Sequence, residues 1–130
     1  MAARFPRPLA ALLVTLLLVG APGATSTQGP GPRVIEITAE RYEFWPSEVV
    51  VDEGEEVELR LRSVDTMHGF RLVGGGGSVL IPKRGKGYVA IKYTGSKPGR
   101  YTFECHRMCG AGHNFMRGVL VVRPRTGASP

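Results

Sequence analysis

Residues 100–123 read RYTFECHRMCGAGHNFMRGVLVVR, and this stretch limits the fold and the function that the chain can have. Its two ends, 100–104 and 119–123, are rich in β-branched and aromatic residues, which is typical of strands. Between these ends lie both cysteines of the chain and two of its three histidines. A loop between two predicted strands therefore holds most of the side chains that bind soft metals.

The chain on the N-terminal side of this stretch follows the same strand pattern. Residues 57–62 alternate apolar and charged side chains with a period of two, as expected for a strand with one face in water. Further short strands are predicted at 34–37, 48–52 and 88–93, separated by glycine- and proline-containing turns. No segment shows a helical period over three turns. Short strands at this spacing predict an all-β fold, specifically a β-sandwich.

The N-terminal segment differs from this body. Arg4 and Arg7 precede an apolar run at 9–19, and small residues follow, which is the pattern of a secretory signal peptide. The run is much shorter than the about 20 residues that a membrane-spanning helix needs, so a cleaved signal is favoured over a marginal membrane anchor. We expect an exported protein, in the periplasm or at the outer face of the cytoplasmic membrane. The predicted parts are a signal peptide or anchor at 1–24, a linker at 25–32, one domain at 33–123 and a flexible tail at 124–130.

Charge is distributed unevenly along a chain whose net charge is +6. Residues 33–66 carry ten Asp and Glu against four Arg, whereas residues 67–130 carry eleven Lys and Arg against one acid, Glu104. An exported chain without interleaved aromatic and basic residues gives no support for nucleic acid as a partner. The second half is either a solvated face or a basic surface for a redox partner. The sequence leaves these two interpretations equal.

The central loop carries the pattern Cys-x3-Cys-x3-His-x2-Met, formed by Cys105, Cys109, His113 and Met116. His68 lies upstream, at the start of another predicted strand. Thiolate, thioether and imidazole together select copper. One Cys, two His and one Met would make a mononuclear blue copper site, but two thiolates this close can bridge two copper ions, with one His on each. Met116 would then cap one copper, and a backbone carbonyl of the loop the other.

Other interpretations of the loop remain open. Cys105 and Cys109 could form a disulfide in an exported protein, but a bridge across three residues closes a small loop and stabilises little. His113 and Met116 in register with the cysteines favour copper. A Cys2His2 set also suits zinc, which has no need of the methionine. His106 is either a ligand of a mononuclear site or an exposed loop residue.

The motifs Asp65-Thr-Met-His68-Gly-Phe70 and Cys105-x3-Cys109-Gly-x2-His113-x2-Met116-x-Gly118 resemble the binuclear CuA domain of cytochrome c oxidase subunit II. The resemblance covers roughly residues 33–123 and implies a Greek-key, cupredoxin-like β-sandwich that holds two copper ions. By position, the two cysteines resemble the bridging thiolates and Met116 the thioether ligand. His68 resembles the terminal ligand of one copper, and His113 that of the other.

The chain also departs from the family. Arg107 occupies the position whose backbone carbonyl binds copper, often that of a Glu in the family, and Asp65 is expected to orient the His68 ring. The family's aromatic-rich run is reduced to Tyr42, Phe44 and Trp45, for which core packing is favoured over electron relay. Subunits II normally carry one or two clear membrane helices, and this chain has at best a marginal one.

The resemblance implies a copper-binding electron-transfer protein that accepts electrons from a c-type cytochrome and passes them to a terminal oxidase. We expect oxidase subunits, copper-loading factors and thiol-reducing assembly factors as further partners. Oxygen reduction belongs to another subunit, so the chain is expected to catalyse nothing alone and to be a candidate electron-entry subunit. The alternatives are a periplasmic copper chaperone or storage protein, and a mononuclear blue copper carrier that uses His68, Cys109, His113 and Met116.

Overall fold

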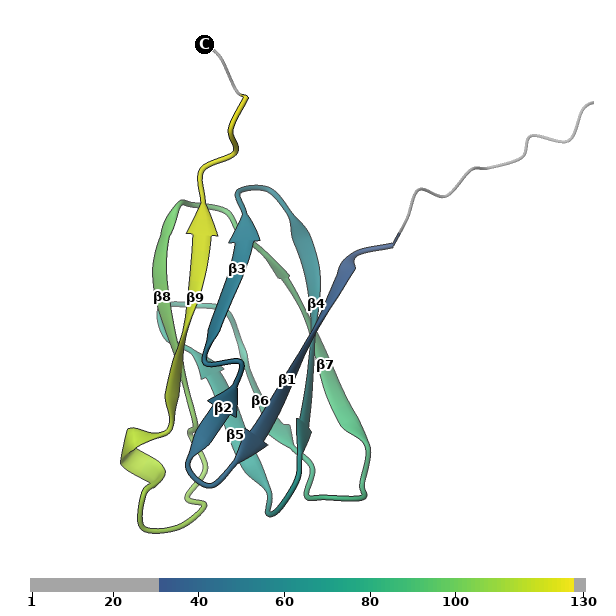
Figure 1. Cartoon of the computed structure of the whole chain (residues 1–130), viewed down its shortest axis with the longest axis vertical. Coiled ribbons are helices and arrows are strands. Elements are labelled where there is room, and N and C mark those ends of the chain that lie inside the picture. The colour runs from purple at the N-terminus through teal and green to yellow at the C-terminus, as the bar shows by residue number, and fades with distance from the viewer. Residues whose placement is uncertain (1–30, 128–130) are drawn as a thin grey trace, which may run out of the picture.

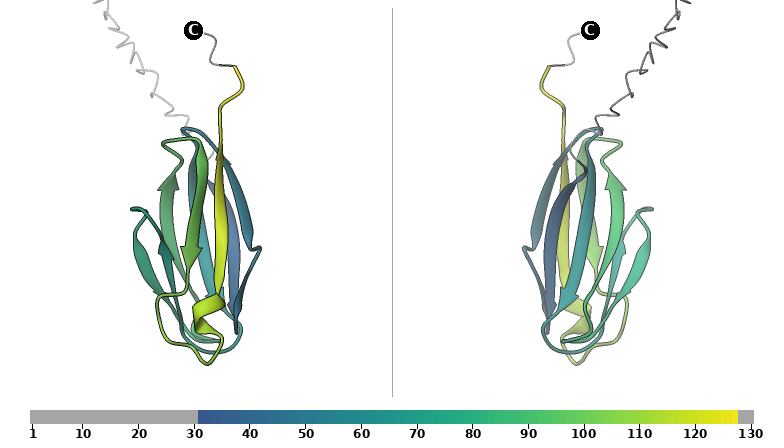
Figure 2. Two further views of the ribbon diagram at one scale, coloured as in Figure 1. Left: turned by 90° about the vertical axis from the view of Figure 1, so that its left-hand side faces the viewer. Right: turned by 90° about the vertical axis from the view of Figure 1, so that its right-hand side faces the viewer.

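Two β-sheets packed face to face make up the described part of the chain, residues 31–127 of a computed structural model (Figures 1 and 2). The four-stranded sheet has the order β2-β1-β4-β7 and the five-stranded sheet the order β3-β9-β8-β5-β6. The first comprises β1 (Arg33–Glu40), β2 (Glu43–Trp45), β4 (Glu56–Ser63) and β7 (Tyr88–Thr94). The second comprises β3 (Glu48–Asp52), β5 (His68–Leu72), β6 (Ser78–Ile81), β8 (Gly99–Glu104) and β9 (Arg117–Arg123).

The connections repeatedly cross from one sheet to the other, and β1 pairs in parallel with β4, as β3 does with β9. This confirms the predicted all-β sandwich. The proposed signal peptide or anchor at 1–24, most of the linker and the last residues of the tail lie outside the described residues. Within residues 31–127, no helix has the length and apolar character needed to span a membrane.

Alternating side chains form the core between the sheets. In β4, Val57, Leu59 and Leu61 are buried while the residues between them are partly exposed, as the sequence pattern predicted. Phe44, Phe70 and Phe103 come from three different strands and pack with ring centroids 5.2–5.9 Å apart. Each buried side chain contributes about 1.5–3 kcal/mol, and each aromatic pair about 0.5–1.5 kcal/mol more.

Trp45 corrects one sequence-based expectation. Phe44 is 1% exposed and lies in the core as expected, but Trp45 is 74% exposed. The reason is the pleat of β2, because successive side chains of a strand point to opposite faces. When Phe44 faces the core, its neighbour must face water. The short strands β2 and β6 and the 3-10 helix η1 (His113–Phe115) were also not predicted.

Strand register brings the predicted ligand segments to one end of the sandwich. Glu104 pairs with Arg117 and with Arg71, which places the end of β8 beside the start of β9 and beside β5. His68, the first residue of β5, pairs with Ile81 at the end of β6. Connections 41–42, 64–67, 82–87 and 105–116 therefore all lie at this end, which we call the ligand end (lower end in Figure 1).

Gly118 provides a test of the packing beneath the ligand loop. A Cβ at this position would overlap the Phe103 ring and lie 2.6 Å from the carbonyl oxygen of Ser47. We expect Gly118→Ala to lower the free energy of unfolding by about 1–3 kcal/mol, since the crowded atoms include backbone. Chemical denaturation measures this change. Gly31→Ala is the matched control, because nothing lies within 4 Å of a Cβ there. Equal stability of the two variants would contradict the packing.

Candidate metal centre

The ligand loop, residues 105–116, connects β8 to β9 and is closed at its neck by the backbone. The N–H of Cys105 donates to the carbonyl of Met116 at 3.1 Å, directly beyond the last paired residues of the two strands. Near its end the loop forms η1, where the N–H of Met116 donates to the carbonyl of His113 at 3.2 Å. Two paired strands therefore hold the first and last predicted ligands side by side.

The loop gathers its sulfur atoms in the interior. Cys105 and Cys109 are free, buried cysteines with Sγ atoms 3.9 Å apart. Met116 is fully buried, and its Sδ lies 3.8 Å from Sγ of Cys109, while Nδ1 of His113 lies 3.7 Å from the same sulfur. The Cys105 thiol donates to the carbonyl oxygen of Arg107 at 3.1 Å. The side-chain and carbonyl atoms predicted as ligands thus cluster around two sulfurs.

His68 completes this cluster from the neighbouring strand. A ring nitrogen of His68 and the sulfurs of Cys105 and Cys109 all lie within 4.8 Å of one another. The ring is fully buried; Nε2 lies 2.7 Å from Oδ1 of Asp65, and Nδ1 has no hydrogen-bond partner. A buried nitrogen without a partner is costly, and a metal ion bound in this cluster would satisfy it.

Asp65 determines which His68 nitrogen is free. Burial opposes ionisation of this carboxyl, but hydrogen bonds from His68 and the backbone N–H of Arg41 outweigh it and lower the pKa of Asp65 to about 2. Asp65 is therefore an anion at neutral pH and accepts a hydrogen bond from the N–H of Nε2. That tautomer leaves Nδ1 as an acceptor, which is the form that ligates metal.

The surroundings of the Cys109 thiol oppose its ionisation. Burial, and then the adjacent Cys105, raise the pKa of Cys109 to about 11. The backbone N–H of Gly69 donates to Sγ of Cys105 at 3.4 Å, which supplies only a weak partial charge. A bound cation would lower the pKa of Cys109, since metal binding releases thiol protons. Two thiolates, two imidazoles and a thioether are soft and borderline donors, and they fit copper.

Two residues that the sequence did not single out as contacts hold the loop from outside. Arg41 Nε donates to the carbonyl oxygen of Cys109 at 2.8 Å. The Tyr42 ring lies against Gly110 and Gly112, where a Cβ would overlap it. The glycines were the only sequence signal of this close approach, because glycine is required where another group contacts the backbone. Nothing in the sequence indicated the role of Arg41.

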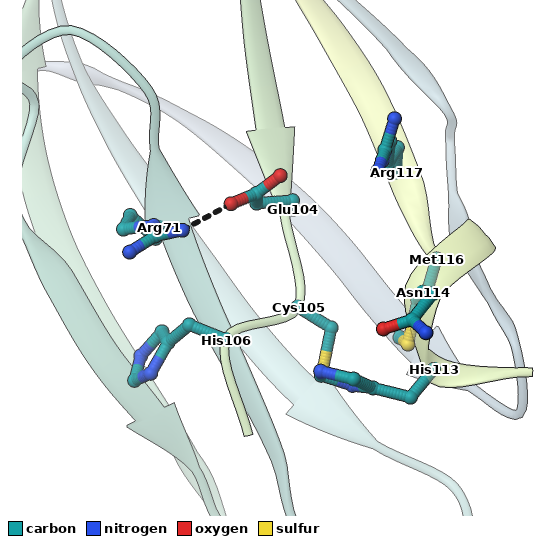
Figure 3. A pocket seen from close by; sticks show the side chains of 8 residues that line it. All are labelled: Arg71, Glu104, Cys105, His106, His113, Asn114, Met116 and Arg117. Atoms are coloured by element: carbon teal, nitrogen blue, oxygen red, sulfur yellow. Dashed lines mark hydrogen bonds and ion pairs between the residues drawn. The ribbon is translucent and has the colours of Figure 1, made fainter. Parts of the chain in front are cut away.

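A polar pocket of about 280 Å³ opens at the ligand end, and Figure 3 shows its lining side chains. Cys105, His113 and Met116 form one part of the wall, and the ion-paired Arg71 and Glu104 form another. His106 also lines the pocket but turns towards β6, where its Nε2 lies 3.2 Å from the carbonyl oxygen of Val79. The imidazole of His106 therefore lies apart from the sulfur cluster, whereas His113 lies between the cluster and the pocket.

Comparisons with known proteins agree with this geometry. No family model matches the chain. A cytochrome c oxidase subunit 2 of Thermus thermophilus is 32% identical over 97 residues, which cover 73% of this chain and 69% of the relative. A second subunit 2, from a named strain of the same species, has the same identity, and the chain spans only 55% of its length.

Solved structures support the same relationship. A heme-copper terminal oxidase dimer has a chain with 30% identity and a TM-score of 0.58, covering 72% of this chain and 66% of that one. The periplasmic domain of subunit II (CoxB) of Bradyrhizobium japonicum superposes with a TM-score of 0.65 at 16% identity, over 74% of this chain and 88% of that domain. Auracyanin A, a blue copper protein of Chloroflexus aurantiacus, has a TM-score of 0.58 at 22% identity, over 72% of this chain and all of auracyanin.

The last two likenesses confirm the predicted cupredoxin-like sandwich. The identity to the Thermus subunit extends over more than two thirds of that protein. The chain therefore belongs to the cytochrome c oxidase subunit 2 family, and its described domain is of the CuA cupredoxin type.

Proposed function

We propose that this domain is an electron-transfer unit that binds two copper ions, accepts electrons from a c-type cytochrome and passes them to a terminal oxidase. The observation that carries the proposal is the buried cluster of Cys105, Cys109 and His68, together with the lack of a hydrogen-bond partner for Nδ1 of His68. A merely structural core would not place two free thiols beside a buried histidine whose Nδ1 has no hydrogen-bond partner. Membership of the subunit 2 family supports copper binding and electron transfer as the role of this cluster.

Each ligand has a part in this proposal. Cys105, Cys109, His68 and His113 would hold the two copper ions. Met116 and the carbonyl oxygen of Arg107 would complete the ligand set. Copper supplies a reversible one-electron couple when it is bound.

The protein contributes a preorganised and largely dry ligand set. Cys105, Cys109 and Met116 are each at most 6% exposed, so water has little access to the sulfurs. Arg41 holds the Cys109 carbonyl, and Asp65 holds the His68 ring. Ligands that keep their positions reduce the reorganisation that each electron transfer requires. His113 is partly exposed at the pocket wall, and it offers the short route from the cluster to a partner.

The cysteine pair also suggests what must happen before copper binds. Two thiols 3.9 Å apart need only a small movement to form a disulfide in an oxidising compartment. CoxB, whose fold this domain shares, has been captured as a mixed disulfide with the thioredoxin-like TlpA. The exported domain would accordingly depend on a thiol-reducing factor and a copper-loading factor before it joins oxidase subunits.

Copper stoichiometry tests the proposed centre. Reduced protein reconstituted with copper should bind two ions per chain that share one unpaired electron in electron paramagnetic resonance. We expect Cys105→Ser to retain at most one copper and to lose the shared-electron signal, because only one thiolate remains. Met108→Ser is the matched control, since Met108 belongs to the same loop and is 71% exposed.

Each other result has a defined meaning. One copper with a blue absorption band in the unaltered protein would identify a mononuclear carrier. Weakly held Cu(I) that does not cycle would identify a copper chaperone or storage protein. Two coppers and an unchanged spectrum in Cys105→Ser would exclude the bridging role of that thiolate.

Asp65→Asn tests the orientation of His68. The amide that replaces one carboxylate oxygen would point a donor at either His68 Nε2–H or the Arg41 N–H, so one hydrogen bond must be lost. We expect copper affinity, measured by competition with a Cu(I) chelator, to fall about 10–100-fold. Glu36→Gln changes the same charge on an exposed residue of β1 and should leave affinity unchanged. Equal affinities in the two variants would show that Asp65 does not orient the ligand.

A further inference from the structure

We infer that the ligand end is a docking surface for an acidic protein, with contacts running from the ligand loop to the β6–β7 loop. This inference rests on the proposed electron-transfer function and names the chemistry of the partner. Electron exchange requires a partner to approach the end where the ligands lie, and the charges at that end determine which partner can do so.

Positive charge is concentrated in the connections at the ligand end. The four connections there contain five Arg and Lys and one acid, Asp65, whose carboxylate is already hydrogen-bonded to His68. The cations are Arg41, Lys83, Arg84, Lys86 and Arg107. At the far end, connections 53–55, 73–77 and 95–98 contain two acids and one Lys. The sequence alone could not distinguish basic residues dispersed over a solvated face from basic residues gathered into one surface. The strand register shows that these five cations lie together at the ligand end.

The β6–β7 loop, residues 82–87, contributes three of these cations and no acid. The backbone N–H of Arg84 donates to the carbonyl of Asp65 at 3.1 Å, which anchors this loop at the ligand end. Within residues 31–127, Lys83, Arg84 and Lys86 form no ion pair, and neither does Arg107. Their charges are therefore available to a partner.

The pocket adds a further uncompensated cation. Glu104 is its only acid and is ion-paired with Arg71, while Arg117 on the same wall forms no ion pair with any residue that the structure describes. Figure 3 shows Arg117 on β9, apart from the Arg71–Glu104 pair. A carboxylate of a partner could bind here within reach of His113.

Exposed apolar side chains lie among these cations. Met108 and Phe115 belong to the ligand loop and are 71% and 83% exposed. Protein interfaces are enriched in aromatic residues, Met and Arg, with apolar contacts surrounded by a polar rim. An apolar loop beside unpaired cations fits a protein whose apolar contact is bordered by Asp and Glu.

The remaining acids predict how the partner is placed. Glu40 and Glu43 face each other across the β1–β2 hairpin, at the opposite edge of the four-stranded sheet from β7. Their repulsion should displace an acidic partner towards the β6–β7 loop. An anionic lipid surface could also meet the cations, but a lipid neither supplies nor accepts the electron, so the proposed function favours a protein.

Paired charge reversals separate local docking from net charge. Lys83→Glu/Lys86→Glu alters the β6–β7 loop, and Lys97→Glu/Arg125→Glu makes the same change in net charge at the far end. The rate constant for electron transfer from a reduced acidic c-type cytochrome would be measured by stopped flow at low ionic strength. We expect roughly tenfold slower transfer for the first variant, less than twofold for the second, and no difference at about 1 M salt.

Several results would overturn the inference. Equal slowing by both variants would mean that only net charge matters, and faster transfer from a basic c-type cytochrome would reverse the sign of the partner. Copper-free protein binding to phosphatidylglycerol vesicles but not to the oxidised acidic cytochrome, with binding lost in Lys83→Glu/Lys86→Glu, would assign the surface to a membrane. Both variants should still bind two coppers and be reduced by ascorbate. A loss there would count against the proposed function, and not against the docking surface.

Discussion

The hydrogen bond between Asp65 and His68 is the contact on which the ligand end depends. It holds a buried ring at the start of β5, and it engages Nε2 so that Nδ1 keeps a free lone pair. The same carboxylate accepts the backbone N–H of Arg41, whose side chain holds the Cys109 carbonyl. The Asp65 carboxylate therefore links the β1–β2 and β4–β5 connections to the ligand loop. Its low pKa keeps the carboxylate ionised, and so keeps these hydrogen bonds, at neutral pH.

The sandwich supplies what this local network cannot. Pairing of Glu104 with Arg117 sets the two ends of the ligand loop side by side, and the Phe44–Phe70–Phe103 cluster fills the space beneath them. Close packing resists changes in volume. The packed core therefore keeps the candidate ligands in position when the charge of the centre changes. Stability and preorganisation of the ligands thus come from the same contacts.

Burial of the candidate ligands costs free energy, and metal binding offsets that cost. Two thiols and an unpartnered imidazole nitrogen are unfavourable in an apolar core, and the raised pKa of Cys109 records part of that penalty. Cation binding converts these groups into satisfied ligands. The exposed surface of the ligand end differs from this buried centre. Met108, Phe115 and the unpaired cations lie there, where another molecule can contact them.

Sequence by itself determined the strand class and singled out the candidate ligands. Period-two alternation needs only neighbouring residues, and the Cys-x3-Cys-x3-His-x2-Met spacing lies within one loop, so both are local. The tertiary structure decided what depends on distant segments: the exposure of Trp45, the contacts of Arg41 and Tyr42, and the grouping of the β6–β7 cations with the ligand loop. Strand register creates these neighbours, and no short-range pattern encodes it, because each pairing joins residues that are far apart in the chain.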